Sequence, residues 1–290
     1  MITLLASITL ATLPKIATTA DVLKDAPPSA WVAVPPDDLL VVDSATGRVV
    51  IQLAPFAPAH TAAIRALARA GRFDGGAVVR VQDNYVVQFA VKEARDTSGG
   101  AQGPGAPKPG PKLPAEYDWA ASKTWTALPY RDAYAAQAGF HDGWPAARGG
   151  GREWLVHCYA MVGAGRDNPP DTGDGSELYA VIGHAPRHLD RNMAVVGRVI
   201  DGLPQWSALP RGTETLGFYK DKAQRTPITR VRIAADMPAA ERPRYIVMDT
   251  GSPSFKALVT ARANRTESFF ATPANAVDVC NVAVPVKPAP

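Results

Sequence analysis

The sequence predicts a mainly β protein whose strands form a closed antiparallel barrel or a sandwich, with few helices. Three observations lead to this class. Short segments of alternating apolar and polar residues recur along the chain, turns rich in glycine and proline separate them, and helical spacing is confined to a few segments. The pattern alone leaves the choice between barrel and sandwich open.

The first half of the chain contains the clearest patterns. Residues 39–43 form a short apolar strand, and after a turn residues 48–53 alternate as a half-buried strand does. Residues 60–70 have apolar residues at helical spacing, and Gly71 follows them as a C-cap would. Two further strands, each preceded by a turn, are predicted at 77–81 and 85–89.

The middle of the chain is interpreted as an insertion over residues 90–153. Residues 96–114 are rich in glycine and proline and predict a flexible surface loop. A short helix is predicted at 130–138, and glycines at 149–151 end the insertion. Later barrel-type strands are predicted at 154–162, 178–182, 194–200 and 228–234.

The segment 237–290 differs in character and predicts a C-terminal α/β extension. It should hold a strand at 245–249, a helix beginning at Ser252-Pro253 and ending near Arg265, and a last strand at 278–286. The division that we expect is a signal peptide at 1–20, a lead-in at 21–37, a main domain at 38–236 and this extension.

Charge and termini narrow the function classes. A net charge of +4 without a dense Lys/Arg run argues against a nucleic-acid partner. The apolar run 2–13 is too short to span a bilayer but fits a secretory signal, cleaved near Ala20–Asp21. No Lys or Arg precedes the run, so a structural N-terminal segment remains the alternative. We therefore expect an exported, periplasmic protein without stable membrane insertion.

The two cysteines, Cys158 and Cys280, leave two readings open. In an exported chain they could form a single disulfide, and otherwise they are two buried thiols. A zinc site built from these cysteines and His157 lacks the usual ligand spacing. We predict no metal.

A family resemblance rests on several motifs. They are GRVVIQLAPFAPAHTAAIRALARAGRFDGG at 47–76, VVRV at 78–81, NYVVQFA at 84–90, LPAEY at 113–117, AMVGA at 160–164, GSELY at 175–179 and HLD at 188–190. Together they resemble the cyclophilins, a family of peptidyl-prolyl cis-trans isomerases, over about residues 38–236. The resemblance implies a closed antiparallel eight-stranded barrel capped by two helices, carrying the insertion and the C-terminal extension.

The resemblance also implies a site. Arg80 would be the catalytic residue, with Gln88 orienting it or bonding the substrate backbone. The proline pocket would be lined by Tyr85, Met161, Tyr179 and Leu189. Backbone groups near Gly163 would hold the peptide extended. Further binding residues would be Glu177, His188 and Met193. The reaction would need no cofactor, metal or covalent intermediate.

Some positions depart from the family pattern. The family's tryptophan that helps bind cyclosporin-type cyclic peptides is His188 here, and the glutamine of its Gly-Ser-Gln motif is Glu177. Other departures are Val79, Phe89-Ala90 and Met193. Two function classes follow: an exported, monomeric isomerase acting on proline-containing polypeptides, or a non-catalytic module that binds such segments. Retention of Arg80 and Gln88 favours the first.

Overall fold

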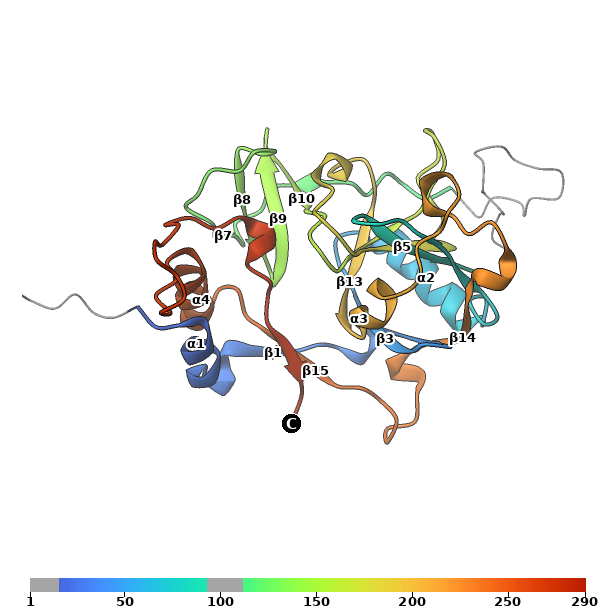
Figure 1. Cartoon of the computed structure of the whole chain (residues 1–290), viewed down its shortest axis with the longest axis horizontal. Helices are drawn as coiled ribbons and strands as arrows, with labels where there is room; N and C mark the ends of the chain where they lie inside the picture. The colour runs from blue at the N-terminus through green and yellow to red at the C-terminus, as the bar shows by residue number, and fades with distance from the viewer. Residues whose placement is uncertain (1–15, 93–111) are drawn as a thin grey trace, which may run out of the picture.

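The protein is built around a closed barrel of antiparallel strands, on the right of Figure 1. The computed structural model describes residues 16–92 and 112–290. The strands pair in the order β11 (Met161–Ala164), β12 (Glu177–Val181), β5 (Val86–Ala90), β4 (Ala77–Val81), β14 (Thr226–Ile233), β2 (Leu39–Ser44), β3 (Gly47–Leu53) and β13 (Val195–Asp201). Strand β13 pairs back onto β11, so the eight-stranded barrel predicted from the sequence is confirmed.

Alternation along the strands fills the barrel with apolar side chains. Phe89 of β5 lies at the centre, with its ring 5.1 Å from that of Trp206. Trp206 belongs to helix α3 (Leu203–Ser207), and helix α2 (Pro58–Arg69) contributes Ile64 to the same core. Both helices therefore bury their apolar faces against the barrel, as the resemblance implied.

Helix α2 begins without a side-chain cap from its preceding residue, and Glu116 supplies the missing acceptor. Its carboxylate accepts hydrogen bonds from the backbone N–H groups of Ala59 at 2.9 Å and His60 at 3.0 Å. A carboxylate at this end also complements the helix dipole. Gly71, at φ +63°, follows the helix in the left-handed conformation that glycine adopts without strain.

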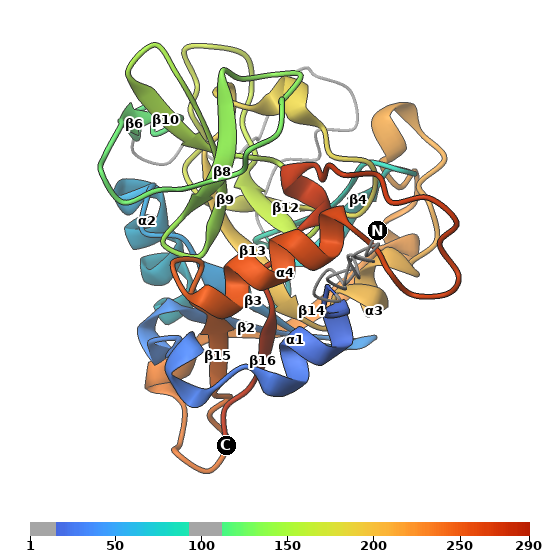
Figure 2. The ribbon, with the colours of Figure 1, turned by 90° about the vertical axis from the view of Figure 1, so that its left-hand side faces the viewer.

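A second lobe lies beside the barrel and is formed largely by the insertion. Its sheet has the order β6 (Trp119–Ala120), β10 (Arg152–Leu155), β9 (Trp144–Gly149), β8 (Gln137–His141) and β7 (Thr126–Ala127). Helix α4 (Pro253–Ala263) lies across this sheet in Figure 2. Phe140 of β8 meets Phe255 of α4 edge to face at 4.8 Å, so insertion and C-terminal extension share one core.

The prediction of a short helix at 130–138 is wrong. That segment is irregular until strand β8 begins at Gln137. Asp142 and Gly143, at φ 45° and 85°, form a tight turn that returns the chain as β9. Asp-Gly at a two-residue hairpin is a strong pairing signal, and it decides the conformation over the helical propensity of the alanines.

The C-terminal extension is joined to the lead-in. Strand β15 (Tyr245–Met248) pairs with β1 (Trp31–Ala33) on one side and β16 (Val286–Pro288) on the other. The predicted helix cap is present, because the Ser252 hydroxyl accepts from the backbone N–H of Phe255 at 3.1 Å. The helix ends at Ala263, slightly earlier than predicted.

The prediction of a last strand at 278–286 is wrong. A 3-10 turn, Val279–Asn281, occupies its start, because the Asp278 carboxylate accepts from the backbone N–H of Cys280 at 2.8 Å. The strand at this end of the chain is β16. Other 3-10 turns lie at Pro28–Ala30, Pro36–Asp38, Arg187–Leu189, Thr215–Gly217, Lys222–Gln224 and Ala234–Asp236.

The N-terminal region begins, within the described residues, with helix α1 (Thr19–Asp25). The predicted cleavage point, Ala20–Asp21, lies in the first turn of this helix, and Val22 packs into the core of the second lobe. The signal peptide and the domain division stay predictions. The loop predicted at 96–114 falls mostly outside the described residues. No helix in 16–92 or 112–290 is long and apolar enough to cross a bilayer.

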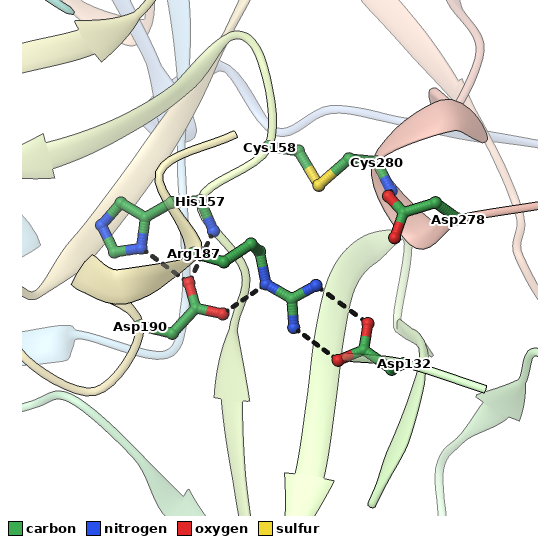
Figure 3. The surroundings of a disulfide bond; sticks show 7 residues. All are labelled: Asp132, His157, Cys158, Arg187, Asp190, Asp278 and Cys280. Carbon is green, nitrogen blue, oxygen red and sulfur yellow. Dashed lines mark hydrogen bonds and ion pairs between the residues drawn. A yellow bond between two sulfur atoms is a disulfide. The ribbon is translucent and has the colours of Figure 1, made fainter. Parts of the chain in front are cut away.

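A disulfide joins the loop that leads from β10 of the second lobe to β11 of the barrel to the C-terminal extension (Figure 3). Cys158, in the loop between β10 and β11, is bonded to Cys280 of the final 3-10 turn, with Cα atoms 4.9 Å apart. The bond links residues 122 positions apart in the sequence. It therefore restricts the unfolded chain across almost the whole second half of the protein.

We predict that replacing both cysteines by serine lowers the free energy of unfolding by about 4–5 kcal/mol in the chain-entropy picture, because a long loop is released. Urea unfolding of wild type and of the double variant measures the difference. Wild type treated with a reductant serves as the control and should unfold at the same midpoint as the variant. An unchanged midpoint in the variant would contradict the prediction.

Candidate active site

Arg80 lies on β4, opposite Gln88 of β5, where the pairing of the two strands shifts register after Val78. Its guanidinium is held by three acceptors. Nε donates to the carbonyl oxygen of Leu216 at 2.6 Å, Nη1 donates to Oε1 of Gln88 at 3.3 Å, and Nη2 donates to the side chain of Gln82. The arginine head is therefore fixed in position before any ligand arrives.

Two aromatic rings flank this guanidinium. Its central carbon lies 5.5 Å from the ring centre of Tyr85 and 5.4 Å from that of Phe218. Burial lowers the pKa of Arg80 and raises that of Tyr85, because in each case the charged form loses hydration: protonated arginine and deprotonated tyrosine. Arginine nonetheless stays charged at neutral pH. The site thus offers a cation in a setting poor in water.

Gln88 connects Arg80 to a carboxylate. Its Oε1 faces Arg80, and its Nε2 donates to Oε2 of Glu177 at 2.8 Å. Glu177 comes from β12, which pairs with β5 so that Tyr179 stands opposite Gln88. The two halves predicted from the sequence, which lie about ninety residues apart, therefore meet across one pair of strands.

An apolar cluster borders the arginine. It comprises Val86, Tyr179 and Val181, with Tyr85, Leu189 and Met193 packed against them. The exposed ring of His188 stacks on Tyr85 with ring centres 6.2 Å apart. Five residues predicted for the binding site are thus brought together here. We call the cluster Val86, Tyr179, Val181, Tyr85, Leu189 and Met193 the apolar cup.

Two predicted residues take other places. Met161 packs into the core of the second lobe, in a cluster separate from the cup, and Val86 contributes to the cup instead. Gly163 lies within β11 opposite Tyr179, and a Cβ there would come within 2.2 Å of the Tyr179 hydroxyl and ring. The absence of a side chain at 163 is what admits the tyrosine ring.

The Tyr179 hydroxyl begins a buried polar chain and lies 2.9 Å from Nε2 of His157. Figure 3 shows the rest of this chain, in which Nδ1 of His157 is 3.0 Å from Oδ1 of Asp190. Arg187 then donates from Nε to Oδ2 of Asp190 at 2.6 Å, and from both Nη atoms to Asp132 at 2.9 and 3.0 Å. This polar chain connects the apolar cup to the insertion.

Charges within this chain compensate one another. Burial acts to lower the pKa of Arg187, but the hydrogen bonds and charges of Asp132 and Asp190 outweigh it, so the pKa is raised. Burial likewise acts to raise the pKa of Asp132, and its hydrogen bond to Arg187 reverses the direction. Burial raises the pKa of Tyr179 well above its usual range.

Sequence reasoning missed several of these residues. Leu216 and Phe218 lie in a loop without periodic pattern, and nothing local indicates that they cover Arg80. His157 was considered only as a zinc ligand, although its partners Asp190 and Tyr179 both stand in the quoted motifs. In the described residues, no group of three or more His, Cys, Asp or Glu side chains is arranged to hold a metal ion.

Comparisons with known proteins agree with the fold. A family model described as cyclophilin type peptidyl-prolyl cis-trans isomerase/CLD matches residues 39–235. Among solved structures, cyclophilin AquaCyp293 from Hirschia baltica is similar, with 24% sequence identity and a TM-score of 0.68 over 94% of this chain and 97% of that chain. No curated protein matches the chain.

More distant similarity extends to a cyclophilin type peptidyl-prolyl cis-trans isomerase from Cryptosporidium parvum. Its structure in the presence of the dipeptide Ala-Pro has 11% identity and a TM-score of 0.41, covering 67% of this chain and 98% of that chain. A second structure of the same protein has 12% identity and a TM-score of 0.42, covering 68% and 96%.

We predict that Arg187→Ala lowers the free energy of unfolding by about 3–5 kcal/mol, because two buried carboxylates lose their partner. The side chains of Arg187 and Asp132 are only 4% and 2% exposed. Arg152→Ala is the control, since its pair with Asp118 is at the surface and solvent screens it. Equal losses for the two variants in thermal or urea unfolding would contradict the prediction.

Proposed function

The chain belongs to the cyclophilin-type peptidyl-prolyl cis-trans isomerase family and is an enzyme of that class, and on this premise we propose that Arg80 promotes rotation of the X–Pro bond without a covalent intermediate. The observation that supports this role is the arginine head itself. It is charged, shielded between two rings, fixed by three acceptors, and placed beside the apolar cup.

The reaction defines what such an arginine must do. The amide C–N bond has partial double-bond character, and its rotation has a barrier of about 18–20 kcal/mol. In the twisted amide the prolyl nitrogen is no longer conjugated and becomes basic, while the carbonyl turns away. A fixed donor can bind that nitrogen or hold the rotating carbonyl oxygen, and either contact favours the twisted form over the planar ground state.

Arg80 retains donors for this purpose. Its Nε–H is used by Leu216, and one N–H of each Nη nitrogen is used by Gln88 and Gln82. Within residues 16–92 and 112–290 no further acceptor is bonded to these nitrogens, so the second N–H of each is open to a substrate atom. Because the three protein contacts already fix the guanidinium, little reorganisation accompanies the reaction.

The apolar cup supplies the other half of the site. A proline ring has no donor and is held by apolar contact, for which Tyr179, Leu189 and Met193 are suited. Tyr85 borders both the cup and the guanidinium, so a proline anchored there would present its amide to Arg80. Gly163, opposite Tyr179, contributes to the cup by leaving room for the Tyr179 ring.

The proposal also covers setting and partners. The enzyme acts on proline-containing polypeptides, as a monomer, after export to the periplasm. The apolar run at 2–13 supports export, and a disulfide between Cys158 and Cys280 fits an oxidising compartment. The alternative, a non-catalytic module that binds proline-containing segments, would share the cup without using the arginine.

We predict that Arg80→Ala lowers kcat/KM about a hundredfold or more, the usual effect of removing a preorganised donor. Arg80→Lys should restore little, because a point charge cannot occupy the three acceptors and also donate to the amide. A protease-coupled isomerisation assay on short Xaa-Pro peptides measures both variants. Circular dichroism confirms that each is folded.

The matched control is Arg48→Ala, which removes another barrel arginine. Arg48 is paired with the half-buried Asp43 and lies outside the site. Its turnover should equal that of wild type. Wild-type turnover in folded Arg80→Ala would remove Arg80 from the mechanism. Binding of Xaa-Pro peptides by wild type without any turnover would favour the non-catalytic module.

A further prediction concerns cyclosporin-type cyclic peptides. His188 is exposed and offers less apolar area than the family's tryptophan, and Met193 alters the adjacent rim. We expect the isomerase activity to resist such inhibitors. His188→Trp should recover about 1–3 kcal/mol of binding free energy, as a buried aromatic anchor does. Titration of inhibitor against both proteins measures this, and tight inhibition of wild type would refute the prediction.

A further inference from the structure

His157 is the most enclosed titratable group near the cup, and its role is not explained by the proposed reaction. Its side chain is 1% exposed, in the loop between β10 and β11. Both ring nitrogens have partners, since Nε2 lies 2.9 Å from the Tyr179 hydroxyl and Nδ1 lies 3.0 Å from Oδ1 of Asp190. Its backbone N–H donates to the same Asp190 oxygen at 3.0 Å. The histidine is therefore locked in place on two sides.

The partners determine the direction of the hydrogen bonds. Asp190 accepts from Arg187 at 2.6 Å and is held as a carboxylate, which can only accept. The proton of a neutral His157 ring therefore sits on Nδ1, and Nε2 is left as an acceptor. With the ring in this neutral form, the Tyr179 hydroxyl donates to Nε2. Arg187 and Asp132 continue this series of hydrogen bonds. A residue of the insertion, Asp132, therefore helps to determine the tautomer of His157.

Tyr179 is the link between this chain and the cup. Its ring packs with Val86 and Val181 on one side and crosses the backbone at Gly163, while its hydroxyl reaches His157. The rings of Tyr179 and His157 are nearly parallel, with an angle of 9° between their planes. Packing alone confines the ring to the cup, and the hydroxyl contact fixes its tilt.

We propose that His157 is a positioning residue for substrate binding: it anchors Tyr179 through the hydroxyl and so sets the wall against which the proline ring packs. The role rests on the proposed function of the cup. Asp190 and Arg187 hold the histidine in its accepting form. Asp132 ties this assembly to the insertion, and the disulfide at the neighbouring Cys158 ties it to the C-terminal extension. The second lobe thus acts on substrate affinity without touching substrate.

Three variants separate this role from a purely structural one. His157→Asn retains a side-chain nitrogen near the Nδ1 position for Asp190 but removes the partner of Tyr179. His157→Gln is the matched control, because its longer side chain places an amide oxygen near the Nε2 position, where it accepts from the hydroxyl. Tyr179→Phe removes the hydroxyl itself. All are made in the full chain and assayed with one Xaa-Pro peptide series.

We expect His157→Asn to raise KM about threefold to tenfold while kcat changes less than about twofold, because ground-state packing of the proline is what is disturbed. His157→Gln should keep KM within about twofold of wild type. In the Tyr179→Phe background, adding His157→Asn should change KM by less than about twofold, since the contact is already gone.

The decisive result is this non-additivity. An equal increase in KM from His157→Asn in both backgrounds, or an unchanged KM in folded His157→Asn, would overturn the positioning role while leaving the isomerase function intact. Should His157→Asn fail to fold, His157→Gln is compared with Tyr179→Phe instead. A wild-type KM in His157→Gln together with a raised KM in Tyr179→Phe supports the role. Equal increases in both variants overturn it. Peptide dissociation constants from calorimetry give the same comparison independently of turnover. A wild type that neither turns over nor binds the peptides would overturn the proposed function and this role together.

Discussion

The pairing of β5 with β12 is the contact on which the site depends. It places Tyr179 opposite Gln88 and Glu177 opposite Ala90, so that side chains of two remote segments share one face. A shift of one residue would turn all of them to the other face, with Phe89 and Leu178 leaving the core. Closure of the barrel through β13 and β11 fixes this register, since no strand edge remains where the pairing could slip. The site is thus a consequence of the same geometry that fills the core.

The residue pattern predicted most of the barrel strands for a physical reason, whereas their closure into a barrel was implied by the family resemblance. Strands such as β4 and β14 have one face in the core and one outside, which produces the alternation that can be seen in the residues. Strands β8, β9 and β10 of the second lobe are buried along most of their length, so they lack the alternation of apolar and polar residues that marks a half-buried strand. The chemistry of Arg80 was found through motif order, whereas Phe218 was not, because its contact is made by a loop.

The two lobes are held together by buried polar contacts. Arg198 of β13 donates from Nη1 to the carbonyl oxygen of Gly143 in the insertion at 2.7 Å and lies over the ring of Trp144 at 4.4 Å. Burial lowers its pKa to about 9, so it remains protonated at neutral pH. Oε1 of Gln52 accepts from the same guanidinium at 3.0 and 2.8 Å, so the buried charge of Arg198 is satisfied by acceptors from both lobes. The insertion is therefore an integral part of the molecule.

Glu177 shows how a departure from the family pattern can serve the same site. An amide such as that of Gln88 can present either its oxygen or its nitrogen to a neighbour, and a glutamine at position 177 would accept both arrangements. A carboxylate only accepts, so Glu177 requires Nε2 of Gln88 to face it, as it does at 2.8 Å. Oε1 of Gln88 must then face Arg80 and accept from Nη1. Arg80 can only donate and requires the same arrangement, so both neighbours of Gln88 hold its amide in one orientation.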